Sequence, residues 1–237
     1  PETILPKKNW FKNFDKIWHP EEQTALKELQ SFIKERITNY SEGRNFPNIA
    51  GTSKLSPFIK FGHLHVETIW SECIKKKSKN IGSSKFLAEI GWREFNHSLI
   101  NYFPHMLKNN YSKKFDNFPW QKNSKFLNAW KKGLTGYPIV DAGMRELYTT
   151  GWMHNRVRMI VGSFLVKHLL IDWKEGEKYF RSCLLDYSPA NNVAGWQWVA
   201  GSGADAAPYF RIFNPILQGE KFDKEGGYVK KWVPELK

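Results

Sequence analysis

The stretch Asp186–Pro215, DYSPANNVAGWQWVAGSGADAAPYFRIFNP, decides how the chain is interpreted. It places Trp196 and Trp198 two residues apart and Asn191 next to Asn192, among glycines and prolines at turn-forming positions. A site for a planar ligand with a polar edge uses aromatic rings for stacking, amides for the edge and small residues where the backbone comes close. The stretch therefore predicts a ligand pocket. The alternative is a tryptophan-rich helix that ends in a turn.

The composition favours an intracellular protein with a polyanionic partner. The 237 residues can form one large domain or two small ones, and 36 Lys and Arg against 23 Asp and Glu give a formal net charge of +13. Such an excess is typical of nucleic-acid binding, although a merely basic protein would share it. Cys73 and Cys183 lack the spacing of metal ligands and fit a reduced compartment. We expect a cytoplasmic protein without a signal peptide, membrane partner or metal.

The apolar periodicity predicts an all-α domain, because helix follows helix with almost no alternation of period two. Residues 1–20 are expected to form an arm and residues 21–237 the domain. Helices are expected over 21–38, 62–77, 82–102, 124–132, 138–150, 155–170 and 175–185, and an extended tail over 216–237. The residues expected to face the core are Ala25, Leu26, Leu29, Phe32, Ile33, Ile37, Leu64, Ile69, Ile74, Leu87, Ile90, Phe95, Leu99, Ile100, Ile139, Val140, Ala142, Met144, Leu147 and Tyr148.

Two segments carry polar residues in patterns that suit ligand binding. Residues 40–56 are expected to form a loop that ends with Thr52, Ser53, Lys54 and Ser56 just before a helix, which suits a pyrophosphate. The alternative is ordinary capping of that helix. In the helix 82–102, Glu89, Arg93 and Asn96 share one face. Here the alternative is an ion pair on a wet surface.

Several long motifs resemble the DNA photolyase/cryptochrome family, and within it the cyclobutane-dimer photolyases. They are WQWVAGSGADAAPYFRIFNP, TGYPIVDAGMREL and TGWMHNRVRM, and the resemblance extends from about Tyr40 onward. It implies the helical FAD-binding domain of that family, without the N-terminal α/β antenna domain. It also implies FAD as the cofactor, reduced when active, with no antenna chromophore in this chain.

The resemblance implies roles for individual residues. Those implied for FAD are Tyr40, Thr52, Ser53, Lys54, Leu55, Ser56, Arg93, Trp152, Arg158, Asp186, Ser188 and Asn192. Those implied for damaged DNA are Arg44, Glu89, Trp92, Asn96, Asn155, Arg156, Met159, Trp198 and Gln218. Trp120, Trp173 and Trp196 are implied to pass electrons from the surface to the flavin.

Some of these positions also have plain structural interpretations. Asn155 could cap a helix, His154 could titrate, and Asp186 could form a structural ion pair with Arg158. Two residues depart from the family pattern: Phe86 replaces a pocket tryptophan of some relatives, and Ser188 replaces a second aspartate of many.

The predicted function is light-driven repair of cyclobutane pyrimidine dimers. Such a lesion must be flipped out of the duplex into a pocket. Damaged DNA is the expected partner and a monomer the expected state. One alternative is a cryptochrome-type light sensor with the same flavin and no repair. Another is a helical nucleic-acid-binding module without flavin.

Overall fold

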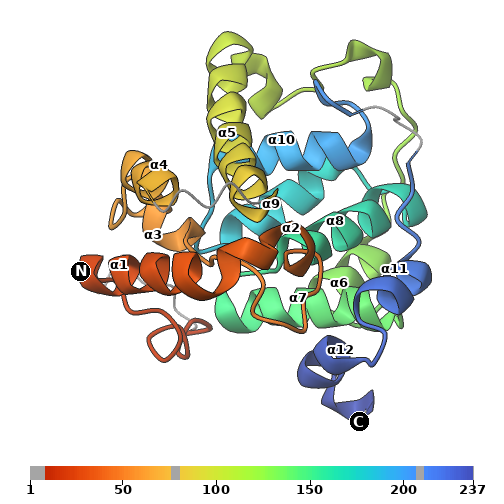
Figure 1. The fold of residues 1–237 in the computed structure, drawn as a ribbon. Coiled ribbons are helices and arrows are strands. Elements are labelled where there is room, and N and C mark those ends of the chain that lie inside the picture. Colours follow the sequence, from red (N-terminus) through yellow and green to blue (C-terminus); the bar gives the residue numbers. More distant parts are fainter. Residues whose placement is uncertain (1–8, 76–80, 207–210, 237) are drawn as a thin grey trace.

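The computed structural model describes residues 9–75, 81–206 and 211–236, and every regular element within them is helical. This confirms the all-α prediction. In Figure 1, α10, α9, α8 and α7 follow one another through the middle of the molecule, with α5 upright beside them and α1 across one side. The helices are α1 Glu22–Ser31, α2 Tyr40–Gly43, α3 Ser56–Lys60, α4 Val66–Lys75, α5 Ile81–Tyr102, α6 Ser124–Lys132, α7 Pro138–Thr150, α8 Asn155–Ser163, α9 Trp173–Cys183, α10 Pro189–Ala200, α11 Pro215–Phe222 and α12 Gly227–Trp232.

Irregular helical turns extend two of these helices. A π-turn over Phe32–Arg36 and a 3-10 turn over Ile37–Asn39 carry α1 into α2, and a π-turn over Phe164–His168 extends α8. Short 3-10 turns also occur at Pro104–Leu107, Lys113–Phe115 and Pro234–Leu236. Together with the first two of these turns, α1 forms a helical segment that ends at Asn39, close to the end predicted at residue 38.

Two clusters of buried apolar side chains form the core. The larger one draws mainly on α6 to α10, and the smaller one on α1 to α5. Helix α10 packs against α9, α8 and α5, so the helical part of the stretch Asp186–Pro215 lies at the centre of the fold. Residues 207–210 of that stretch, and Lys76 and Lys77 of the predicted helix 62–77, lie outside the described residues.

Local sequence signals set the ends of several helices. Pro138 begins α7, where a missing N–H costs nothing, and Gly151 ends it with a left-handed φ of 69°. Asn123 caps α6 by accepting from Phe126 N at 3.0 Å. Both helices have the bounds that the sequence predicts.

Four predicted segments need correction. Residues 40–43 are helical instead of looped, and α8 with its π-turn ends at His168. Helix α4 begins at Val66 and not at Gly62, whose left-handed φ of 75° does not fit a helix. Helix α9 begins earlier, at Trp173, because Asp172 accepts from Lys174 N and caps it there.

Three predicted core residues lie at the surface instead. Ile74 is 52% exposed because it is five residues from buried Ile69, on another face of α4, and Cys73 takes the buried position. Tyr148 is half-exposed and stacks on Trp10, with ring centroids 5.6 Å apart. Phe95 is 45% exposed, on the same face of α5 as Trp92 three residues earlier.

The C-terminal tail is helical, and the predicted extended wrap is wrong. Asn214 caps α11 by accepting from Ile216 N and Leu217 N. Asp223 then accepts from Tyr228 N and Val229 N at the start of α12, after Gly226 has turned the chain with a φ of 68°. The tail does not show the alternation of apolar and polar residues that is typical of a strand. Its two helices, however, are too short to show the long apolar stripe by which a helix is recognised in a sequence.

Residues 9–20 lie against the C-terminal end of α7. Trp18 Nε1 donates to Thr150 O at 2.8 Å, and a side chain at Gly151 would meet the ring of Phe14. That residues 1–20 form a linker or arm stays a prediction. The division of the chain at residue 20 stays a prediction.

Candidate functional site: a cavity between α5, α8 and α10

A cavity of about 800 Å³ lies between α5, α8, α9 and α10, with the start of α3 at its edge. It lies within the size range of sites for small molecules and cofactors. The lining includes half of the residues predicted for FAD and most of those predicted for DNA, although these are far apart in the sequence. The predicted residues that line it are Arg44, Ser56, Glu89, Trp92, Arg93, Asn96, Asn155, Arg158, Met159, Asp186, Ser188, Asn192, Trp196 and Trp198.

The remaining predicted residues do not line the cavity. They are Tyr40, Thr52, Ser53, Lys54, Leu55, Trp120, Trp152, Arg156, Trp173 and Gln218. Arg156 donates to Asn45 and lies over the ring of Phe222 at 4.4 Å, on the side of α11. Gln218 belongs to α11 itself.

An ion pair links two sides of the cavity. Arg158 Nη2 lies 2.8 Å and 3.1 Å from the two carboxylate oxygens of Asp186. Ser56 Oγ also donates to Asp186, at 2.7 Å, so the start of α3 is tied to the start of the central stretch. The Asp186 side chain is only 4% exposed. The pair predicted from sequence is therefore formed, and it joins three segments around the site.

Asn192 is oriented by a buried glutamate. Asn192 Nδ2 donates to Glu177 Oε1 at 3.2 Å, and Tyr187 and Arg181 donate to the same carboxylate. With its NH2 group engaged on α9, Asn192 offers its carbonyl oxygen to a ligand in the cavity. Glu177 was not among the predicted site residues, because it lies fifteen positions from Asn192 on another helix and carries no local signal.

A chain of hydrogen bonds joins α5 to α10 along the cavity wall. Asn96 Nδ2 donates to Asn191 Oδ1 at 2.9 Å, and Asn191 Nδ2 donates to Ser188 Oγ at 3.0 Å. Ser188 Oγ lies 3.5 Å from His97 Nε2. Ser188 thus has a polar partner of its own in place of the charged contacts that an aspartate would make. His97 and Asn191 were not among the predicted site residues.

Glu89 meets two cations at the cavity edge. Arg44 donates to it directly, and Lys85 Nζ lies 3.3 Å from the same oxygen. Arg44 also lies over the ring of Tyr40 at 5.4 Å. Burial raises the pKa of Tyr40 to about 12, so this phenol stays neutral beside the pair. Glu89 belongs to the cavity and not to an isolated surface ion pair.

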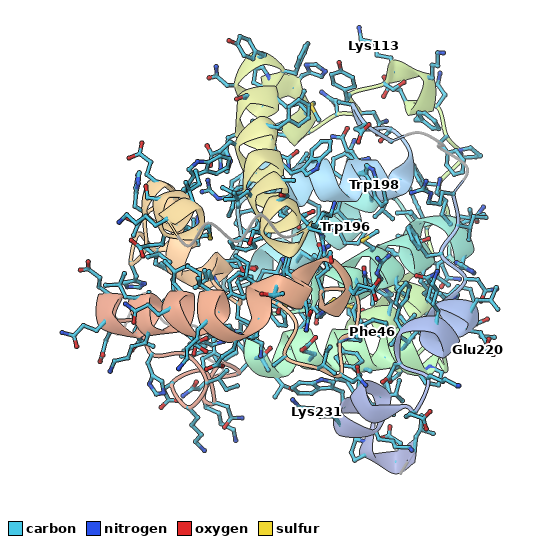
Figure 2. All side chains as sticks on the ribbon, viewed as in Figure 1. Phe46, Lys113, Trp196, Trp198, Glu220 and Lys231 are labelled. Atoms are coloured by element: carbon cyan, nitrogen blue, oxygen red, sulfur yellow. The ribbon has the colours of Figure 1, made fainter. Side chains whose placement is uncertain are left out.

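Two tryptophans offer stacking faces to the cavity. Trp92 on α5 is 45% exposed, and Phe95 lies beside it with ring centroids 5.5 Å apart. Trp198 on α10 is half-buried, with Arg211 5.8 Å from its ring. Figure 2 shows Trp196 and Trp198 near the centre of the molecule. The exposed Phe95, predicted for the core, thus adds another ring to the lining.

The segment of residues 52–56 reaches the cavity through Ser56, the first residue of α3. No side chain caps α3, and Ser53 Oγ instead accepts from Leu55 N at 3.4 Å within the loop. The capping interpretation of these hydroxyls is therefore wrong. Lys54 has a left-handed φ of 53°, and its ammonium lies 5.3 Å from the ring of Trp152. Phosphate binding by this loop stays a prediction.

The three predicted relay tryptophans occupy different depths. Trp196 lines the cavity and packs so closely on Gly176 of α9 that an added Cβ would lie 2.1 Å from its ring. Trp173 is buried in the larger core cluster, and Trp120 is half-buried against that cluster. Trp196 and Trp173 are thus both buried, and Trp120 alone of the three is partly exposed. The relay itself stays a prediction.

His154 caps α8, so the capping role suggested for Asn155 is wrong. His154 Nδ1 accepts from Arg156 N at 3.2 Å, and burial, then the nearby positive charges of Arg156 and Arg158, lower the pKa of His154 to about 3. Asn155 instead lines the cavity and lies 3.9 Å from Met159 Sδ. His154 therefore stays neutral at physiological pH.

The lowered pKa of His154 predicts acid sensitivity of the fold. The pKa of His154 is about 3 in the folded protein and 6.5 in the unfolded chain, so the unfolded chain takes up a proton first as pH falls. The stability that is present above pH 6.5 is therefore lost as pH falls towards 3. We expect the free energy of unfolding to fall by several kcal/mol over this window, at up to ~1.4 kcal/mol per pH unit from this group. The substitution His154→Asn keeps an acceptor that can cap the helix and removes the imidazole. In urea titrations His154→Asn should show a shallower pH dependence; an unchanged slope would contradict the assignment.

The described part of the chain contains neither a cluster of metal ligands nor a membrane-spanning helix. Across 9–75, 81–206 and 211–236, the structure forms no group of three or more His, Cys, Asp or Glu able to hold a metal ion. Within the same ranges no helix combines the length and apolar character needed to cross a bilayer. The absence of a metal from the function stays a prediction.

Comparison with known proteins decides the family. Residues 86–237 match the family described as the FAD binding domain of DNA photolyase. The chain belongs to the DNA photolyase family. A deoxyribodipyrimidine photo-lyase of Agrobacterium fabrum is 54% identical, with 98% of this chain and 49% of that protein covered. FAD is thus the cofactor for which this photolyase domain is built.

Two solved structures show the same fold. The class III photolyase from Agrobacterium tumefaciens superposes with a TM-score of 0.94 at 52% identity, covering 99% of this chain and 49% of the other. The cryptochrome of Synechocystis superposes with a TM-score of 0.89 at 35% identity, covering 100% and 50%. The chain thus spans about half the length of the photolyases that it matches. Both branches of the family share the arrangement of helices described above.

Proposed function

We propose that this chain splits cyclobutane pyrimidine dimers in DNA, using light and a bound reduced FAD. The observation that carries the proposal is one cavity whose lining includes residues from each of the two sets predicted from sequence. Asp186, Arg158 and Asn192 come from the flavin set, while Glu89 and Trp92 come from the lesion set. Electron transfer between a cofactor and a lesion needs both in one enclosed space.

The donors and acceptors of one part of the cavity fit a flavin. Asn192 offers an acceptor oxygen, and the Arg158–Asp186 pair combines a cation with a buried anion beside it. Ser56 adds a hydroxyl near the loop proposed for the phosphates. The FAD, when bound and reduced, supplies the light-excited electron. The residues hold the ring, orient its edge and exclude water.

The exposed part of the cavity fits a flipped pyrimidine pair. Trp92 and Trp198 supply stacking faces, worth about 1–3 kcal/mol per base, which would offset much of the cost of flipping. Glu89 and Asn155 supply polar edge partners. Because Glu89 is paired with Arg44, it would exchange that contact for the lesion, leaving Arg44 to meet a DNA phosphate.

The second candidate is a blue-light sensor that binds FAD and performs no repair. The similarity to the Synechocystis cryptochrome supports this second candidate, since the two chains share one fold. The two functions differ in whether the lesion residues are needed. Repair requires Glu89, Trp92, Asn155, Met159 and Trp198 together, whereas a sensor requires only the flavin.

The test is a repair assay on the flavin-loaded, chemically reduced chain. An oligonucleotide with one cyclobutane thymine dimer is illuminated with blue light, and intact thymines are counted by chromatography. We expect repair in the light and none in the dark. Bound flavin with no repair under light would favour the sensor, and a chain without flavin would favour the flavin-free nucleic-acid-binding module.

Binding to DNA should depend steeply on salt. The net charge of +13 provides a rim that holds phosphates without reading sequence. Affinity for a dimer-containing duplex should fall by roughly 10- to 1000-fold between 50 and 200 mM salt, if about two to six phosphates are neutralised. Fluorescence anisotropy measures this. A flat response would contradict the electrostatic part of the proposal.

Trp120→Phe should separate photoreduction from repair. If Trp120 is the outer relay residue, its loss stops light from reducing oxidised flavin, because phenylalanine is much harder to oxidise. Repair by chemically reduced protein should stay normal. The matched control is Trp70→Phe, an exposed tryptophan on α4 outside the cavity lining. Loss of repair in prereduced Trp120→Phe would show that the relay assignment is mistaken.

A further inference from the structure

The side chain of Asn110 lies between the indole of Trp173 and a carboxylate. Trp173 Nε1 donates to Asn110 Oδ1 at 2.9 Å, and Asn110 Nδ2 donates to Asp116 Oδ1, also at 2.9 Å. An indole N–H can only donate and a carboxylate can only accept, so the two partners fix the orientation of the amide. Asn110 therefore presents its carbonyl oxygen to Trp173, and both residues are buried.

A glutamine of α10 holds the segment that carries Asn110. Gln197 Nε2 donates to Met106 O at 2.8 Å and to Asn109 O at 3.0 Å, and its Oε1 accepts from Tyr111 N at 2.8 Å. Gln197 is fully buried, and in the sequence it lies between Trp196 and Trp198. Lys113 marks the outer part of the same segment in Figure 2. The segment thus keeps a fixed position relative to both α10 and Trp173.

We propose that Asn110 is a positioning residue that stabilises Trp173 when Trp173 carries positive charge in the electron relay. The inference rests on the proposed function, in which Trp196 first gives one electron to a light-excited oxidised flavin. Trp173 then gives one electron to Trp196, so that Trp196 is restored and Trp173 becomes a cation. No proton moves in this step, and the flavin is the only oxidant it needs.

The environment of the two indoles favours transfer in this direction. The N–H of a cationic indole is a stronger donor, and hydrogen bonds from charged groups are about twice as strong as those between neutral ones. Trp196 Nε1, in contrast, is buried and meets no acceptor among the described parts of the chain. The positive charge is therefore better stabilised on Trp173 than on Trp196.

Asp116 strengthens the effect of Asn110. A carboxylate that accepts from the amide NH2 polarises the amide and makes its carbonyl oxygen a better acceptor. Asn110 itself has no basic group, so the indole proton stays on Trp173. The charge can then move onward to Trp120 instead of being trapped by loss of a proton.

Asn110→Leu and Asp116→Asn test the inference, with Asn109→Leu as the matched control on an exposed neighbour. The first readout needs neither light nor flavin: the ¹⁵N-labelled indole N–H signal of Trp173 in the apoprotein. It should shift and exchange faster with solvent in Asn110→Leu and stay unchanged in Asn109→Leu. An unshifted signal in Asn110→Leu would overturn the contact.

The second readout is the rate at which light reduces bound oxidised flavin, at matched flavin content and unfolding temperature. We expect a fall of roughly 3- to 10-fold in Asn110→Leu and about twofold in Asp116→Asn. Because Asp116 is exposed, Asp116→Asn decides the question if Asn110→Leu does not fold. Unchanged rates in both variants would overturn the role of Asn110 but not the proposed function. A wild-type chain that binds no flavin, or does not photoreduce it, would overturn the proposed function with it.

Discussion

Asp186→Ala is expected to destabilise the fold by about 3–5 kcal/mol and to remove most of the bound flavin, because it leaves the partly buried Arg158 without its anion. The same substitution also frees Ser56, so the start of α3 loses its tie to the central stretch. Urea unfolding and the flavin-to-protein absorbance ratio measure the two effects.

The control for Asp186→Ala is an ion pair far from the cavity. Glu28 pairs with Arg36 at 3.4 Å on a more exposed surface, with the Glu28 side chain 44% exposed. Glu28→Ala should therefore change stability by no more than ~1 kcal/mol and leave flavin content unchanged. Equal stabilities for the two variants would contradict the structural role of Asp186, and normal flavin content in Asp186→Ala would contradict its role in binding.

Trp92→Ala is expected to weaken binding of dimer-containing DNA by roughly 5- to 150-fold, the equivalent of about 1–3 kcal/mol of lost stacking. The fold should tolerate the change, because Trp92 is 45% exposed on α5 and belongs to neither core cluster. Flavin content should remain normal. The measurement is a titration of labelled duplex with and without the lesion.

The matched control for Trp92→Ala is Trp70→Ala. Trp70 is 42% exposed on α4 and does not line the cavity, so its removal should leave lesion affinity unchanged. Loss of flavin in Trp92→Ala would show that this ring serves the cofactor. Equal weakening by the two substitutions would point to a non-specific effect of surface aromatic residues.

Much of the fold could be predicted from sequence where a local signal exists. Pro138 and Gly151 bound α7 and Asn123 caps α6, because each residue acts on the backbone within one turn of its own position. Failures occur where the signal is weak or ambiguous. Ile74 and Phe95 are apolar residues at helical positions, and sequence alone does not show that one faces solvent and the other a cavity.

The candidate site was predictable to a different extent. Five of the predicted lining residues lie in the long motifs by which the chain resembles one family, namely Asn155, Arg158, Met159, Trp196 and Trp198. The residues that orient them could not be found in this way. Glu177 orients Asn192, His97 meets Ser188 and Asn110 holds Trp173 through contacts between different segments. Such partners emerge only once the helices are packed.

The central claim is that one cavity holds both the flavin and the flipped lesion. A crystal structure of the flavin-loaded chain with a dimer-containing oligonucleotide tests it most directly. We predict the flavin ring beside Asn192 and the Arg158–Asp186 pair, with the dimer between Trp92 and Trp198 in the same cavity. A flavin bound elsewhere, or a dimer that remains stacked in the duplex outside this cavity, would contradict the account.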